Sequence, residues 1–249
     1  MLDLNKEYWE NRAKEKGHTG WSDPIIYSYD QKIRLNTIEF MLQLLSIRGG
    51  SALDYGCGTG DFSVLLSKFF DKVKATDLSD NVIEIAKNKN YRKNIEYLRL
   101  NYDSIFKNEY NLILSITVLQ HILNDNDLLK LLKNFSKSIK NNGVIILLES
   151  FSDNDKENIN NYIINRTEEH FFNLVTCTGL KVSYSYNFYD PYKLNKNFNS
   201  IFFRILRKLV LFNIPFSRVA LEFLMKKLTN NKNGIVDYNN KTKILILTK

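Results

Sequence analysis

Short strand patterns alternate with helical patterns along the middle of this chain, and this alternation restricts the possible folds more than any other feature. The apolar, β-rich runs are 51–56, 72–77, 95–101, 110–116 and 143–150. The helical patterns between them lie near 61–70, 80–90 and 124–140. Strict alternation of strand and helix predicts a parallel sheet with right-handed crossovers. Several runs are apolar almost throughout, as in strands covered by helices on both faces, so we expect a doubly wound α/β fold.

The other segments are expected to complete a single domain, residues 1–249. We expect 1–50 to form a helical cap or lid and 51–190 to form the ligand-binding core. A strand pattern at 241–249 closes the chain. Between the core and this strand, two helical patterns predict a helical insertion at 191–238.

The positive charge of the chain is concentrated in this insertion. Residues 191–235 contain nine Lys or Arg and one acid, a net charge of +8 that equals the formal net charge of the whole chain. The basic residues are Lys193, Lys196, Arg204, Arg207, Lys208, Arg218, Lys226, Lys227 and Lys232. The segment is suited to bind an anionic acceptor, to lie on a membrane surface or to bind RNA. The alternative is a solvated helix pair whose apolar face covers the sheet or forms a homodimer contact.

Other features narrow the class of protein. With 44% hydrophobic and 25% charged residues, the composition is that of an ordinary globular protein. The charged start lacks the apolar segment of an export signal, and no uncharged apolar run reaches the ~18 residues of a spanning helix. Cys57 and Cys177 offer neither a disulfide framework nor metal-ligand spacing. We therefore expect a cytoplasmic protein without a bound metal.

A glycine-rich turn follows the first strand and points to a ligand site. The segment 56–60, Gly-Cys-Gly-Thr-Gly, lets the backbone turn sharply and approach a ligand. A helix starting near Asp61 would present free N–H groups there. The second strand ends in Asp77, whose carboxylate can accept both hydroxyls of a ribose, and Leu78 beside it can pack on an adenine.

These motifs resemble a known family. The segment LDYGCGTG, followed by ATDLS, is similar to the nucleotide-binding half of the class I S-adenosylmethionine-dependent methyltransferases. The resemblance covers residues 1 to about 190 and the final strand. It implies a Rossmann-like, mostly parallel seven-stranded sheet with an antiparallel closing strand, and S-adenosyl-L-methionine as cofactor. The G-x-G-x-G spacing differs from the G-x-G-x-x-G of NAD enzymes, which disfavours a dehydrogenase.

The resemblance also implies which residues contact the cofactor. Gly56, Cys57, Gly58 and Gly60 would lie beside its methionine and ribose portions. Asp54 would anchor the turn or reach the amino group through water.

Two strand ends carry further expected contacts. In the family, the third strand usually ends in an acid that reads the adenine amino group, and here Asn101, Tyr102 and Asp103 compete for that role. The fourth strand runs into SITVLQHI, where Ser115 is the expected backbone contact.

The N-terminal segment EYWENRAKE resembles a helix that folds over the cofactor in many small-molecule members. Tyr8 and Arg12 lie four residues apart, on one helix face, where they would meet the carboxylate of the cofactor. The alternative is that Tyr8 and Trp9 only pack the helix against the core.

Two histidines are candidates for a catalytic base. His121 follows the fourth strand and lies near the methyl group by analogy, and His18 lies on a polar segment suited to a lid. His170 falls within a predicted helix and is expected to be structural.

Together these features predict a methyltransferase that O-methylates a small anionic metabolite or a surface-glycan precursor, at a sugar or phosphate-type group. No [DNS]-P-P-[YFW] signature of amino-group methylation is present. The alternatives are an RNA methyltransferase that uses the basic insertion and a non-catalytic scaffold with the same fold. The intact glycine turn and Asp77 argue against a scaffold, and nucleic acid is the less favoured partner.

Overall fold

The computed structural model describes residues 2–20, 23–101, 105–106, 109–154, 157–160, 162–188 and 241–249, and five single residues between 205 and 223. The predicted basic insertion, 191–238, therefore lies outside the described residues except at those five positions. Two candidates for the adenine contact, Tyr102 and Asp103, also lie outside them. The proposed roles of the insertion stay predictions.

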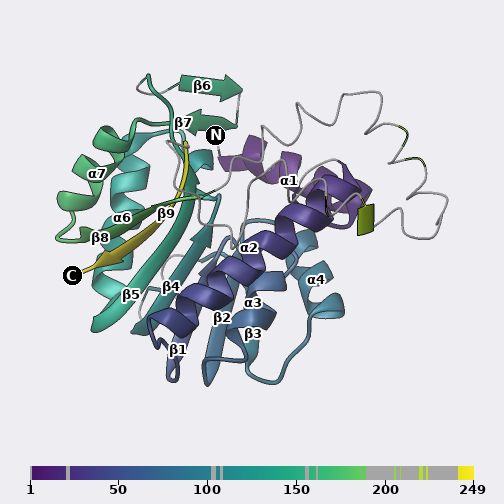
Figure 1. Ribbon diagram of the computed structural model, residues 1–249, viewed down its shortest axis with the longest axis horizontal. Helices are drawn as coiled ribbons and strands as arrows, with labels where there is room; N and C mark the ends of the chain where they lie inside the picture. The colour runs from purple at the N-terminus through teal and green to yellow at the C-terminus, as the bar shows by residue number, and fades with distance from the viewer. Residues whose placement is uncertain are drawn as a thin grey trace.

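Seven of the described strands form one sheet, which confirms the predicted seven-stranded sheet, and their order is β3-β2-β1-β4-β5-β9-β8 (Figure 1). The strands are β1 (Ser51–Tyr55), β2 (Lys72–Asp77), β3 (Ile95–Arg99), β4 (Tyr110–Ile116), β5 (Ile139–Ser150), β8 (Lys181–Asn187) and β9 (Thr242–Thr248). The first five pair in parallel. The last strand, β9, runs antiparallel to both β5 and β8, which confirms the predicted closing strand.

Helices cover both faces of the sheet. On one face lie α2 (Pro24–Leu44), α3 (Asp61–Leu66) and α4 (Asp80–Lys89), and on the other lie α6 (Asp125–Ser138) and α7 (Glu168–Thr176). Alternate residues of β1 show the division, because Ala52 packs toward α2 and α3 while Leu53 packs toward α6 and α7. Figure 1 shows α2 crossing one face of the strands. Burial on both faces explains the continuous apolar runs.

Helix α6 ends earlier than its sequence pattern indicated. The pattern extended to 140, but β5 begins at Ile139, which pairs with Tyr110 of β4. The start of the helix agrees with the sequence pattern. Asn124 caps it, because its side chain accepts a hydrogen bond from the Asn126 N–H. Ile139 is fully buried, so it satisfies the apolar pattern of the helix while it adopts an extended backbone.

The first fifty residues contain α1 (Leu2–Lys16) and α2. Asp23 caps α2 by accepting hydrogen bonds from Ile25 N and Ile26 N, and Pro24 occupies the first helical position. The sequence patterns did not predict a hairpin, β6 (Glu157–Asn160) and β7 (Ile163–Asn165), within the polar stretch after β5. In Figure 1 this hairpin lies at the same end of the sheet as α1. No helix among the described residues has both the length and the apolarity needed to cross a membrane.

Candidate functional site

A cavity of about 580 Å³ lies at the carboxyl ends of β1, β2 and β4. The strand order reverses here, since β1 is followed in the chain by β2 on one side and paired with β4 on the other. Ligands of open parallel sheets collect at this type of position. Residues of α1, α2, α6, the β4–α6 loop and the β6–β7 hairpin complete the wall.

The glycine-rich turn forms the floor of this cavity. Gly56, Cys57 and Gly58 line it, and the N–H groups of Gly56 and Cys57 both donate to the Thr76 carbonyl, at 2.8 and 2.9 Å. Gly56 has a φ of +74°, and a Cβ there would lie 2.4 Å from a methyl carbon of Val118. Only glycine satisfies both constraints, so the turn keeps a close backbone approach to the cavity.

Asp77 connects the end of β2 to this turn. Its Oδ2 accepts a hydrogen bond from Gly58 N and its Oδ1 accepts one from Ser79 N, both at 3.1 Å. Burial raises the pKa of the carboxyl, and the backbone hydrogen bonds oppose this rise. Each carboxylate oxygen has a second lone pair, and both Asp77 and Leu78 line the cavity. The carboxylate is thus suited to accept two ribose hydroxyls.

Asp54 is buried beneath the turn and also lines the cavity. Its Oδ2 accepts a hydrogen bond of 2.6 Å from Ser63 Oγ, which joins β1 to α3. Burial raises the pKa of Asp54 to about 7, against the hydrogen bond from Ser63. Burial likewise raises the pKa of the Cys57 thiol. The carboxylates of Asp61 and Asp77 give this end of the cavity a negative potential, and Asp54 adds to it when it is ionised.

Helix α1 contributes Tyr8 and Arg12 to the wall, as the sequence predicted for one helix face. Arg12 donates from Nη1 to Tyr8 Oη at 3.1 Å and from Nε to the Gly20 carbonyl at 2.8 Å. It therefore holds the segment after α1 against the helix. Its guanidinium has five N–H groups, so donors stay available for an anion in the cavity.

A second arginine in the wall was not predicted. Arg34 lies on α2, where it forms a 2.8 Å ion pair with Asp30 and donates to Thr117 Oγ1 at 3.2 Å. No local sequence signal distinguishes Arg34 from other charged residues of this helix. Its position depends on how α2 packs across the sheet.

His121 lies in the wall as one member of an aromatic cluster, which we define as Tyr8, Trp9, Tyr162 and His121. Its Nδ1 donates to the Tyr162 carbonyl at 2.7 Å, so in the neutral ring Nε2 is the unprotonated nitrogen. Burial lowers the pKa of the imidazole. The Trp9 ring packs edge-on against it, with 4.8 Å between ring centroids.

Tyr162 was missed because it lies in the hairpin that the sequence patterns did not predict. Its ring stacks on Tyr8 at 4.0 Å between centroids. The cluster therefore joins α1, the β4–α6 loop and the hairpin around one end of the cavity.

Several predicted residues do not line the cavity. His18 stacks on Tyr27 instead, with 3.6 Å between ring centroids, and burial lowers its pKa. Gly60 packs under Tyr97. Ser115 is fully buried in β4, and the three residues that follow it in the chain, 116–118, line the cavity instead. Asn101 also lies outside the lining, which includes the preceding Leu100.

The described residues fit S-adenosylmethionine. Asp77 suits its ribose, the glycine turn permits close approach, and the three carboxylates suit its positive sulfonium and amino groups. Arg12 suits its carboxylate. Among the described residues, no group of three or more His, Cys, Asp or Glu is arranged to hold a metal ion.

Comparisons with known proteins identify the family and the fold. Residues 29–182, more than half of the chain, match a family profile described as a methyltransferase domain. The chain is 32% identical over 122 residues to the malonyl-[acyl-carrier protein] O-methyltransferase of Acetivibrio thermocellus, which covers 48% of this chain and 42% of that protein. It is 28% identical over 145 residues to the ubiquinone biosynthesis O-methyltransferase of Coxiella burnetii, which covers 57% of this chain and 56% of that protein. The chain thus spans about half the length of these relatives.

Solved structures share the fold. The magnesium protoporphyrin IX methyltransferase of Synechocystis PCC 6803, with bound S-adenosylhomocysteine, superposes with a TM-score of 0.59 at 13% identity, covering 74% of this chain and 92% of that chain. An S-adenosylmethionine-dependent methyltransferase from Clostridium acetobutylicum superposes with a TM-score of 0.58 at 14% identity, covering 87% of this chain and 91% of that chain. The family profile, the fold and the fit of the cavity agree. This chain therefore belongs to the methyltransferase domain family, the class I enzymes whose cofactor is S-adenosylmethionine.

Proposed function

We propose that this protein transfers a methyl group from S-adenosylmethionine to an oxygen atom of a small anionic acceptor. One observation carries the proposal: the Tyr162 carbonyl accepts a hydrogen bond from Nδ1 of His121, which leaves Nε2 as the unprotonated nitrogen of the neutral ring, in the same cavity as the glycine turn and Asp77.

The chain's residues would hold the cofactor at the glycine-rich end of the cavity. Asp77 would accept the ribose hydroxyls, and the backbone of Gly56 and Gly58 would lie against the ribose and methionine portions. Arg12 would pair with the carboxylate. Bound S-adenosylmethionine supplies an electrophilic methyl group on a positively charged sulfur.

His121 would take the proton from the acceptor hydroxyl on Nε2, while Nδ1 keeps its hydrogen bond to Tyr162. The lowered pKa keeps the imidazole neutral near pH 7. It also makes the ring a weak base, which suits an acidic oxygen such as a phenol, an enol or an acid group better than an aliphatic alcohol. His121 is favoured over His18 as the base, because His18 does not line the cavity.

Two kinds of evidence support a small anionic acceptor. The matched relatives from A. thermocellus and C. burnetii are both O-methyltransferases by name. In addition, Arg34 and Lys130 line the cavity, so positive groups lie within reach of an acidic acceptor. A sugar or phosphate group of a surface-glycan precursor also fits this chemistry.

Calorimetric titration with S-adenosylmethionine, S-adenosylhomocysteine and NAD tests the cofactor part of the proposal. We expect the wild type to bind both adenosyl compounds and not NAD. Asp77→Ala removes two hydrogen bonds to a charged group, each contributing roughly 1.5–3 kcal/mol, so the Kd should rise by at least about 100-fold. Glu84→Ala removes an exposed acid from α4 and is the matched control. Binding of NAD, or equal affinity in Asp77→Ala, would contradict the proposal.

Transfer of radiolabelled methyl groups tests the acceptor class. The acceptors are a hydroxybenzoate, a dicarboxylic acid, a sugar phosphate, a neutral sugar and tRNA. We expect transfer to one of the three anionic small molecules, and a loss of about 10²- to 10⁴-fold in His121→Asn for a hydroxyl acceptor. Transfer to tRNA alone would favour the RNA methyltransferase. Cofactor binding with no transfer to any class would favour the scaffold.

A further inference from the structure

We propose that Glu149 and Arg166 are positioning residues that hold the loop carrying His121 against the cavity from its two ends. This inference rests on the proposed function, because it concerns the residue to which that function assigns the proton. The loop in question, residues 117–124, connects β4 to α6 and contains the short 3-10 helix η1 (Leu119–His121).

Glu149 holds the start of this loop. It lies near the end of β5 and is only 3% exposed, and its buried carboxylate has hydrogen-bond donors around it. One carboxylate oxygen accepts hydrogen bonds from Val118 N at 3.0 Å and Leu119 N at 2.9 Å, and the other accepts one from Gln120 N at 3.3 Å. The three successive N–H groups before His121 therefore point at one fixed carboxylate.

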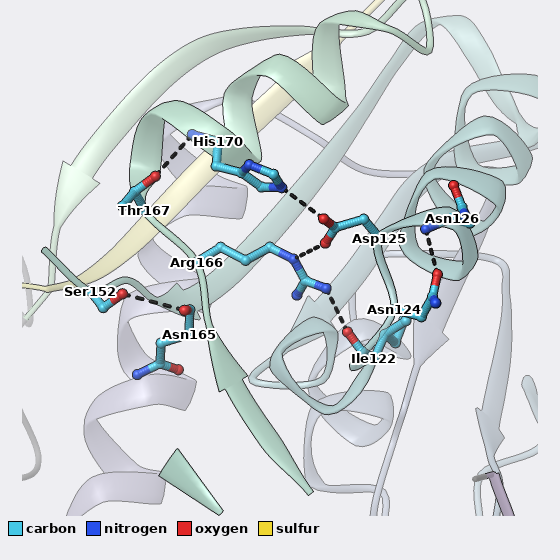
Figure 2. A network of polar contacts seen from close by, with 9 residues as sticks. All are labelled: Ile122, Asn124, Asp125, Asn126, Ser152, Asn165, Arg166, Thr167 and His170. Carbon is cyan, nitrogen blue, oxygen red and sulfur yellow. Dashed lines mark hydrogen bonds and ion pairs between the residues drawn. The ribbon is translucent and has the colours of Figure 1, made fainter. Parts of the chain in front are cut away.

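Arg166 holds the other end. It follows β7, is 4% exposed, and donates from Nη2 to the carbonyl of Ile122 at 2.7 Å (Figure 2). Its Nε donates to Asp125 Oδ1 at 2.8 Å, at the first turn of α6. His121 thus lies between residues whose backbone groups are bound by two buried, oppositely charged side chains.

The network extends beyond this arginine. Figure 2 shows the second oxygen of Asp125 facing His170 of α7, at 3.0 Å from its Nε2. The Arg166 carbonyl accepts a hydrogen bond of 3.0 Å from Ser152 N, just after β5. The sequence assigned His170 a structural role, and here it supports the acid that orients Arg166.

The same segment supplies the partner of the imidazole. Tyr162, whose carbonyl accepts the hydrogen bond from His121 Nδ1, lies four residues before Arg166 in the chain. The short strand β7 is the only covalent path between them. Arg166 therefore fixes both the loop that carries His121 and the hairpin that selects its tautomer.

Nuclear magnetic resonance of the imidazole nitrogens tests this positioning role without an acceptor. The protein has three histidines, so the signals can be assigned by single substitutions. In the wild type we expect the Nδ1-protonated tautomer of His121 to dominate, and a titration midpoint below its ordinary value. In Arg166→Met we expect mixed tautomers and a midpoint shifted toward the ordinary value. Arg166→Lys keeps one donor and should recover part of the wild-type signature.

Two further variants separate positioning from folding. Arg92→Met removes an exposed arginine between α4 and β3 and should leave the His121 signals unchanged. If Arg166→Met fails to fold, Glu149→Gln tests the positioning role in its place. This variant replaces one acceptor oxygen by an amide NH₂, which cannot accept a hydrogen bond from the loop N–H groups. Wild-type His121 signals in a folded Arg166→Met or Glu149→Gln protein would overturn the proposal.

Cofactor binding distinguishes this inference from the proposed function. The Kd of S-adenosylhomocysteine should change less than about threefold in the folded Arg166 variants, since this residue does not line the cavity. Failure of the wild type to bind that compound would remove the proposed function, whereas unchanged His121 signals would remove the positioning role.

Discussion

At the scale of residues, the site depends on acids placed at or near the ends of parallel strands. Asp54, Asp77 and Glu149 belong to β1, β2 and β5, and each accepts hydrogen bonds from the turn or helix that follows or adjoins it. The sequence predicted Asp77 from its position at a strand end and Asp54 from the family resemblance. The same signal, an acid ending an apolar run, was available for Glu149 and was not used.

Burial of Asp54 gives a testable pH dependence of stability. Its pKa is about 7 in the folded protein against 3.8 as the ordinary value, so between these values the folded state holds a proton that the unfolded state has released. This contribution to stability is present below about pH 4 and is lost as pH rises through about 7. Asp54→Asn removes this titration. The free energy of unfolding of the variant, relative to that of the wild type, should therefore rise by a few kcal/mol between about pH 4 and pH 7.

Urea unfolding of both proteins at several pH values measures this difference. Comparing the two proteins removes the contributions of the other buried acids, because both contain them. The asparagine keeps an acceptor oxygen for Ser63 Oγ. Parallel stability curves for the two proteins would show that Asp54 does not titrate in this range.

At the scale of elements, the end of the cavity that contains His121 is assembled from three segments that are distant in sequence. α1, the β4–α6 loop and the β6–β7 hairpin meet in the aromatic cluster. The hairpin was not predicted, because its polar sequence has no clear alternation and its strands depend on contacts with the loop beside them. Helix α1 was predicted from a resemblance, and its orientation over the cavity was not.

The stacking of Tyr8 on Tyr162 is expected to hold α1 on the hairpin. An aromatic pair contributes about 0.5–1.5 kcal/mol beyond area burial, so Tyr162→Ala should speed amide hydrogen exchange in α1 by roughly 2- to 10-fold. Tyr184→Ala removes one member of a stacked tyrosine pair on β8 and serves as control. Equal exchange in α1 for wild type and Tyr162→Ala would show that other contacts hold the helix.

At the scale of the whole molecule, the cavity exists because the sheet order reverses between β2 and β4 and because helices cover both faces. A ligand bound there contacts strands, the cap helices and the hairpin together. Ligand binding to the folded state alone should therefore stabilise the described domain as a unit.

Thermal unfolding with S-adenosylhomocysteine tests this linkage. At a concentration about 100-fold above the Kd, binding stabilises the folded state by about 2.7 kcal/mol, which corresponds to a rise in Tm of roughly 5–10 °C. Asp77→Ala at the same ligand concentration should show little of this rise. A wild-type Tm that does not respond to the ligand, or that responds equally to NAD, would contradict the assignment of the cavity.

The sequence predicted the sheet, the edge of the sheet at which the cavity lies, and several residues that line this cavity. Strand and helix periods, the glycine turn and the acid at Asp77 are local signals, because each follows from the geometry of a few neighbouring residues. The remaining residues reach the cavity, or the loop beside it, only through the packing of distant elements. Arg34, Tyr162, Glu149 and Arg166 form hydrogen bonds with partners up to 83 residues away in the chain, as in the bond from Arg34 to Thr117. No short window of sequence encodes such a contact, since it requires two elements to pack in one register.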